Sequence, residues 1–133
     1  MEASLIETSH GDEYNDRILQ IGKAVEKIME KFMPNIMAIE KLFFTQNQKT
    51  ALKVSEVKGI IMYLAAVSSI PCFEFTPLEV KSSVCGYGKA DKKQVRDMLR
   101  FIFKNYPLPK NDDACDAIAV AYTGMLLVKN RNT

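Results

Sequence analysis

Three aspartates with the spacing of a binding or catalytic site lie within the sequence NDDACDAIAV: they are Asp112, Asp113 and Asp116. Asp112 and Asp113 have a purely structural interpretation. Asparagine is a favoured helix cap, and acids in the first turn of a helix suit the positive end of the helix dipole. Asp116 lies one turn further along, beside an apolar run. Because Asp113 and Asp116 are three residues apart, they share a helix face, where like charges repel unless a cation lies between them. A metal-binding or catalytic role is the chemical alternative to helix capping.

Glu40 is a further candidate carboxylate, because it directly follows the apolar residues 36–39 of an expected buried strand. In open α/β sheets, ligand and catalytic groups tend to lie at the carboxyl ends of the strands. If the helix that carries Asp113 and Asp116 packs beside this strand, three carboxylates converge and offer the hard oxygen ligands that Mg²⁺ prefers. Two such ions activate a water and stabilise the leaving oxygen in phosphodiester cleavage. The alternative is an ion pair of Glu40 with Lys41 or with a helix-borne lysine, and spacing alone leaves both open.

Histidine and cysteine chemistry is disfavoured by the composition. The single histidine, His10, argues against a Ser-His triad, a His-activated cysteine and a histidine metal cluster. The three cysteines, Cys72, Cys85 and Cys115, are odd in number and have no CxxC spacing, so we expect reduced thiols. Acid–base or metal chemistry in this chain therefore falls to carboxylates and lysines.

Positive charge is concentrated in one segment of a chain whose formal net charge is only +2. Residues 81–104 hold two acidic and seven basic side chains, which gives the segment a net charge of +5 and leaves −3 for the rest. The basic residues are Lys81, Lys89, Lys92, Lys93, Arg96, Arg100 and Lys104. A basic segment in a near-neutral domain is a candidate surface for a nucleic-acid backbone, and a solvated helix face is the alternative.

The hydrophobic pattern predicts the elements that must position these residues. We expect helices over residues 14–32, 47–68, 76–84, 90–105 and from 111 onward, and strands over 3–8, 36–39 and 72–75. With 133 residues, of which 47% are hydrophobic, the sequence predicts a single α/β domain over residues 1–133, with a central sheet flanked by helices. The sequence has no run of eighteen apolar residues and no signal-peptide pattern, so we expect an intracellular protein and no membrane association.

Four motifs in register carry a resemblance to a known family. They are AIEKLFF at 38–44, TALKVSEVKG at 50–59, FEFTPLEVKSSVCGYGKADKKQV at 73–95 and DDACDAIAVA at 112–121. Together they resemble the RuvC-type Holliday junction resolvases, from about residue 4 to residue 125. The resemblance implies a ribonuclease H-like fold, a cytoplasmic homodimer, and nicking of symmetric strands of four-way DNA junctions with Mg²⁺, or with Mn²⁺ in its place. A branch-migration helicase complex is the partner that the family implies.

The resemblance also implies roles for the carboxylates. Glu40, Asp113 and Asp116 match three of the four metal-binding carboxylates of the family, and so become the expected catalytic acids. Asp112 matches none of them, and we expect it to be an acid at the start of the helix.

Basic and aromatic residues receive roles in the same way. Lys81 and Lys92 match basic residues near the scissile phosphate, where a lysine would stabilise developing charge. Phe43 matches a residue implicated in stacking on junction bases, which is a physically reasonable role for an aromatic ring, with core packing as its alternative. The same DNA-binding surface is expected to include Lys89, Lys93 and Arg96.

One departure from the family concerns the N-terminus. The family opens with a strand that carries Gly-Ile-Asp-Pro-Gly, whose aspartate is the remaining metal ligand, whereas MEASLIET resembles the third strand of the family. We therefore expect an N-terminally truncated fold that lacks one metal-binding carboxylate, and impaired cleavage. Two alternatives are a branched-DNA-binding dimer that does not cut, and an unrelated α/β domain whose acids cap helices and form ion pairs. The helix over 47–68 holds Ile60, Ile61, Met62, Tyr63 and Leu64 in succession, which is more apolar surface than one sheet face needs. In either DNA-binding case, part of this helix is expected to pack against a second copy.

Overall fold

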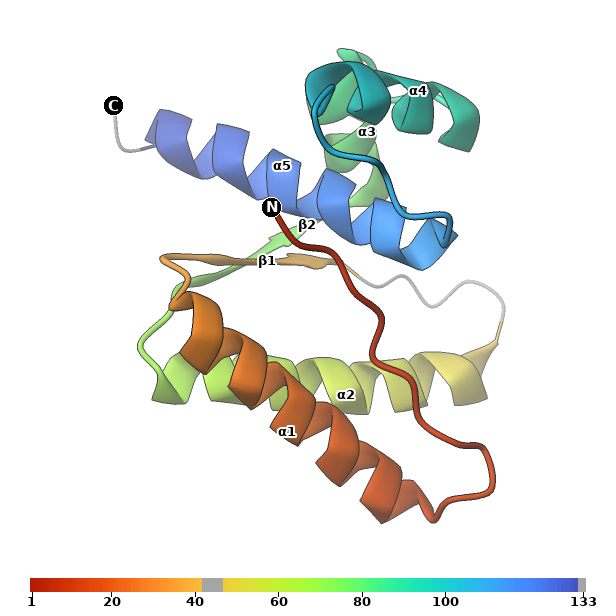
Figure 1. The fold of residues 1–133 in the computed structure, drawn as a ribbon, viewed down its shortest axis with the longest axis vertical. Coiled ribbons are helices and arrows are strands. Elements are labelled where there is room, and N and C mark those ends of the chain that lie inside the picture. The colour runs from red at the N-terminus through yellow and green to blue at the C-terminus, as the bar shows by residue number, and fades with distance from the viewer. Residues whose placement is uncertain (42–46, 132–133) are drawn as a thin grey trace. The chain divides into compact units, whose positions relative to one another are not determined.

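The computed structural model describes residues 1–41 and 47–131 (Figure 1). The elements follow the order α1 (Tyr14–Phe32), β1 (Met37–Glu40), α2 (Gln48–Val67), β2 (Cys72–Phe75), α3 (Pro77–Cys85), α4 (Lys92–Ile102) and α5 (Asp112–Arg131). The described residues form two compact units. The first unit comprises residues 1–5, 38–41 and 73–131, and the second comprises 6–37 and 47–72.

The first unit has its core where α3, α4 and α5 contact one another. Its buried side chains are Phe75, Val80, Val84, Leu99, Ile118, Ala119 and Val120. Phe75 and Leu99 are almost fully buried, so the end of β2 and the middle of α4 are fixed by apolar packing. This packing holds the charged ends of α4 and α5 in a defined position.

The described sheet consists of β1 and β2, which run parallel. The amide of Met37 donates to the carbonyl of Pro71 and that of Lys41 to Phe75, both at 2.8 Å, so the two strands advance together in one register. Glu40 therefore lies at the carboxyl end of β1, as predicted.

The predicted strand over residues 3–8 is wrong, because residues 1–9 have no regular secondary structure. A strand needs a neighbour for its backbone hydrogen bonds. Ala3 instead donates its amide to the hydroxyl of Tyr106 at 3.1 Å. The composition of residues 3–8 shows that the segment is half apolar, but not that a strand lies beside it.

Side-chain caps set the helix boundaries of the first unit. Thr76 caps α3, and Asp91 and Gln94 form a reciprocal capping box at the start of α4. This box makes α4 begin two residues later than predicted. At α5, the Oδ1 of Asn111 accepts from the amide of Ala114 at 3.1 Å, which confirms the predicted start of the last helix.

The second unit contains α1 packed on α2, with Val25, Met29 and Ala65 buried. The predicted bounds of α1 are confirmed, and α2 begins one residue after its cap, Asn47. The hydroxyl of Tyr14 donates a hydrogen bond to the carboxylate of Glu56, and this bond raises the pKa of Tyr14. In the described part of the chain, no helix is both long and apolar enough to cross a membrane.

Candidate active site

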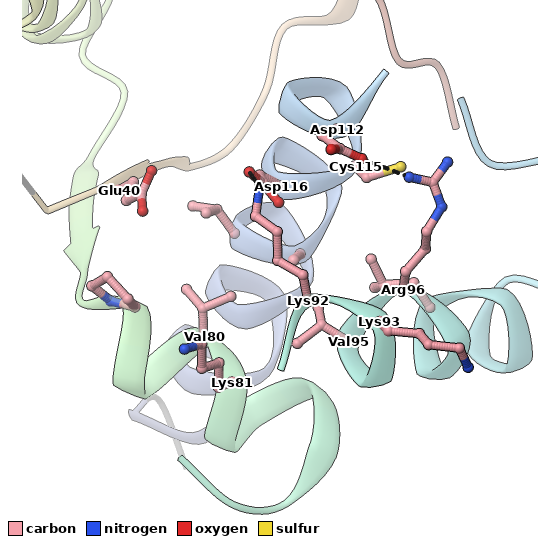
Figure 2. Close-up of a pocket in the computed structure, with 14 residues that line it drawn as sticks. Glu40, Val80, Lys81, Lys92, Lys93, Val95, Arg96, Asp112, Cys115 and Asp116 are labelled. Atoms are coloured by element: carbon pink, nitrogen blue, oxygen red, sulfur yellow. Dashed lines mark hydrogen bonds and ion pairs between the residues drawn. The ribbon is translucent and has the colours of Figure 1, made fainter. Parts of the chain in front are cut away.

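A cavity of about 460 Å³ lies in the first unit, bordered by β1, α3, α4 and α5 (Figure 2). Its apolar lining consists of Pro77, Val80, Val95, Leu99, Ala119 and Val120. Its ionisable lining consists of Glu40, Lys81, Lys92, Lys93, Arg96, Asp112, Cys115 and Asp116. A cavity with an apolar wall and several convergent charged groups is the usual form of a ligand site.

Complementary spacing on two helices brings opposite charges together. Lys92 and Arg96 are four residues apart on α4, and Asp112 and Asp116 are four residues apart on α5. Each pair occupies one face of its helix. The Nζ of Lys92 lies 3.6 Å from Oδ2 of Asp116, and Nη1 of Arg96 donates to Oδ1 of Asp112 at 2.8 Å (Figure 2).

Arg96 also holds the backbone that precedes α5. Its Nη2 donates to the carbonyl of Pro109 at 2.9 Å and to that of Lys110 at 3.4 Å. The buried Cys115 thiol adds a contact of 3.1 Å to the Pro109 carbonyl. Arg96 thus anchors the turn from which α5 starts, a structural role that the sequence analysis did not assign.

The Lys92–Asp116 pair is more accessible than the Arg96 anchor. The side chain of Lys92 is 74% exposed and that of Asp116 is 48% exposed, against 26% for Arg96. Exposed ion pairs contribute little net stability, so Lys92 can leave Asp116 for a stronger anionic partner at small cost.

The remaining predicted basic residues have distinct positions. Lys81 reaches the cavity from α3. Lys93 also lines the cavity, and its ammonium group pairs with Asp97 at 2.7 Å. This hydrogen bond raises the pKa of Lys93 and lowers that of Asp97. Lys89 is exposed but does not line the cavity, and Phe43 lies outside the described residues.

The predicted metal ligands are only partly brought together. Glu40 and Asp116 line the same cavity, whereas Asp113 is exposed and does not line it. Among the described residues, no group of three or more His, Cys, Asp or Glu side chains could hold a metal ion. The donor chemistry suits Mg²⁺, but the arrangement of these residues does not fit a complete metal site. Their role as metal ligands stays a prediction.

Asp112, which the sequence analysis treated only as an acid at the helix start, lines the cavity and binds Arg96. A signal for this contact exists in the sequence. Two cations four residues apart in one helix match two acids four residues apart in the next, and a connection that contains Pro107 and Pro109 separates the helices. This pattern indicates an antiparallel pairing of charges that analysis of each helix alone cannot find.

The sequence and the fold of this chain were compared with those of known proteins. The family model described as crossover junction endodeoxyribonuclease RuvC matches residues 1–124. Proteins of that name from Ruminiclostridium cellulolyticum and Natranaerobius thermophilus are 44% and 41% identical, over 91% of this chain and 73% and 75% of theirs. The structure of Thermus thermophilus RuvC in complex with Holliday junction substrate matches with a TM-score of 0.91 and 26% identity, over 97% of this chain and 78% of that one.

The fold is therefore that of the ribonuclease H-like α/β proteins, as the family resemblance implied. Within that class, the chain belongs to the crossover junction endodeoxyribonuclease RuvC family. The resemblance drawn from the four sequence motifs is confirmed.

Proposed function

We propose that this chain acts on four-way DNA junctions as a RuvC-type endonuclease in recombination and repair. Membership of the family supports this proposal, and so does the likeness to a RuvC that was solved with Holliday junction substrate. The single observation that carries it is the cavity that Glu40 and Asp116 line together with cations from α3 and α4. Acids beside exposed lysines suit a reaction that takes place on a phosphodiester.

Glu40, Asp113 and Asp116 are the proposed catalytic and metal-binding acids. Dependence on Mg²⁺ or Mn²⁺ belongs to the proposal because the family implies it. The described residues do not form a complete metal site, so the proposed reaction steps involve only side chains of this chain.

Lys92 is the proposed phosphate-binding residue closest to the acids. Its ammonium group contacts Asp116 at 3.6 Å, and a DNA phosphate entering the cavity would compete for it. Transfer of Lys92 to the phosphate would neutralise charge as it develops on the phosphoryl oxygens, and would leave Asp116 free. Lys81 would contact the same strand from α3.

A wider DNA surface is proposed around this cavity. Lys89 and Lys93 would contact neighbouring phosphates, and Arg96 would contribute positive potential while it anchors α5. Phe43 would stack on a base at the junction. The proposed location is the cytoplasm, and a branch-migration helicase complex is the proposed partner.

A homodimer is part of the same proposal. On α2, the large apolar side chains of Leu52, Tyr63 and Val67 are exposed. They fall on one helix face, because the separations of eleven residues from Leu52 to Tyr63 and of four from Tyr63 to Val67 are close to whole numbers of helical turns. An apolar face of this kind suits the self-complementary contact of a two-fold dimer, which would present two sites to a symmetric junction.

A second candidate function is a dimer that binds branched DNA without cutting it. It is favoured by the observation that the described acids do not form a group of three. The cations of the cavity would serve such a function unchanged, so the two functions differ in cleavage and not in binding.

One gel experiment tests both functions. The purified chain is incubated with a labelled four-way junction and with linear duplex, each with Mg²⁺ and with chelator. Junction-selective retention with symmetric Mg²⁺-dependent nicks supports the endonuclease, and retention without nicks supports the binding dimer. Equal retention of both DNAs would contradict a junction-specific function. Lys92→Ala is expected to weaken retention, with Lys110→Ala as the matched control, because Lys110 is exposed and outside the cavity lining.

A further inference from the structure

A second cavity, of about 480 Å³, lies in the first unit on the face of α4 opposite to the candidate active site. It is lined by Cys85, Tyr87, Gln94, Asp97, Met98 and Phe101. Phe101 is five residues beyond Arg96, which is close to one and a half helical turns, so these two side chains project to opposite sides of α4. This second cavity is therefore separate from the site that contains Glu40 and Asp116.

Two aromatic rings at this cavity are exposed to solvent. Phe101 is 65% exposed and Tyr87 is 47% exposed, whereas Phe75 in the core of the same unit is 1% exposed. Met98 and Cys85 form the apolar wall beside them. Burial raises the pKa of the Cys85 thiol, which therefore stays uncharged at neutral pH. An open apolar wall flanked by two exposed rings is a surface for a flat, apolar ligand group.

The charge around these rings is positive. The Nζ of Lys104 lies 4.8 Å from the centroid of the Phe101 ring. The one acid in the lining, Asp97, is already bound by Lys93 at 2.7 Å and by Arg100 at 2.9 Å. Asp91 adds a second negative charge near Cys85 and Lys93. Three cations, Lys93, Arg100 and Lys104, are thus present against two acids, and the remaining positive charge, at Lys104 over the Phe101 ring, favours an anionic partner.

We propose that this second cavity binds an unpaired nucleotide of the DNA, whose base stacks on Phe101 and Tyr87 while its phosphates contact Lys104 and its neighbours. The combination of exposed aromatic rings with surrounding cations is the one that single-stranded nucleic acids require, because every base has a stacking face and every linkage a negative charge. The site rests on the proposed function, since a branched DNA is the expected source of unpaired nucleotides. It would hold a strand on the side of α4 that faces away from the cleavage site.

Fluorescence anisotropy tests the stacking directly. The probes are a fluorescein-labelled oligothymidylate and a labelled abasic oligomer of equal length, which has the same backbone charge but no bases. The unchanged chain is expected to bind the oligothymidylate at least about fivefold more tightly, because base stacking on one aromatic ring is typically that strong. Phe101→Ala is expected to remove most of this difference, and Phe101→Tyr to keep it. Met125→Ala is the matched control, since Met125 is an exposed apolar residue of α5 outside this cavity.

Equal affinity of the unchanged chain for the two oligomers would overturn this proposal. The proposal is also overturned if Phe101→Ala keeps the full difference in affinity between the oligothymidylate and the abasic oligomer. If Phe101→Ala instead alters the sedimentation coefficient and leaves that difference unchanged, the patch is a contact between proteins and the proposal is wrong. Preference for a four-way junction over duplex is measured on the same samples. Its absence in the unchanged chain would refute the proposed function, whereas the difference between the oligomers tests the nucleotide site separately.

Discussion

Lys92 of α4 and Asp116 of α5 form an ion pair at 3.6 Å, one helical turn away from the tighter pair of Arg96 and Asp112 at 2.8 Å. Both pairs join a cation of α4 to an aspartate of α5, but the two cations differ in chemistry and in surroundings. Arg96 also donates to the carbonyls of Pro109 and Lys110 and is partly buried, whereas Lys92 has no such contacts in the described structure and is mostly exposed. One pair therefore fixes the start of α5, and the other is available to a ligand.

Removal of the Arg96 anchor is expected to destabilise the fold. Arg96→Ala should lower the free energy of unfolding by about 1–2 kcal/mol, because a partly buried guanidinium loses a carboxylate and two carbonyl partners. Urea unfolding followed by circular dichroism measures this change. Arg96→Lys should have an intermediate effect, since it keeps the charge but not the fork of donors. A midpoint for Arg96→Ala equal to that of Lys110→Ala would contradict the anchoring role.

The three aspartates at the start of α5 are expected to separate into two kinds. We expect the unchanged chain to cleave junctions with impaired activity, and Asp113→Asn and Asp116→Asn should reduce that activity by about a further 100-fold or more. Junction binding should stay equal or become tighter, because negative charge near the phosphates is lost. Asp112→Asn should instead lower stability and leave cleavage by the folded fraction nearly unchanged, because Asp112 binds Arg96. Cleavage rates at saturating protein and retention on gels separate the two effects. Full cleavage by Asp113→Asn would remove that residue from the proposed site.

The helices were predictable from the sequence because their signals are local. The bounds of α1 follow from its apolar periodicity, and the starts of α3 and α5 follow from Thr76 and Asn111, which cap the next turn. The strand expected over residues 3–8 was wrong because a strand depends on a neighbour distant in the sequence. The candidate site was predictable only in part. The carboxyl end of β1 identified Glu40, but no local pattern in the sequence determined which aspartate of α5 lines the cavity.

The phosphate role of the cavity lysines predicts a change in salt dependence. Lys81→Ala and Lys92→Ala should each weaken junction binding and reduce the slope of log K against log salt concentration by about one, as expected for one lost phosphate contact. Titrations of labelled junction at several salt concentrations provide this slope. Lys23→Ala, in the exposed part of α1, is the control and should leave the slope unchanged. An unchanged slope for Lys92→Ala would mean that its ammonium group does not contact phosphate.

The proposed dimer contact on α2 predicts that charge will disrupt it. Tyr63 is 67% exposed, and Tyr63→Glu would place a carboxylate in an apolar interface, where an unpaired charge is strongly unfavourable. We expect sedimentation velocity to show a dimer for the unchanged chain and a monomer for Tyr63→Glu, with similar circular dichroism. Leu19→Glu, at an exposed apolar position of α1, is the control for added charge alone. A monomeric unchanged chain at micromolar concentration would refute the dimer.

The hydrogen bond from Tyr14 to Glu56 predicts an alkaline pH dependence of the second unit. This bond, with smaller contributions from burial and the Glu56 charge, raises the pKa of Tyr14 above its ordinary value of 10.0. Because the folded pKa is higher than the unfolded pKa, the resulting stability is fully present below about pH 10 and is lost as the pH rises through the folded pKa. Tyr14→Phe should therefore be less stable than the unchanged chain at pH 8, and the two urea midpoints should converge at strongly alkaline pH. A difference that stays constant across this range would show that the pKa of Tyr14 is the same in the folded and the unfolded chain, which would contradict a stabilising role of its hydroxyl proton.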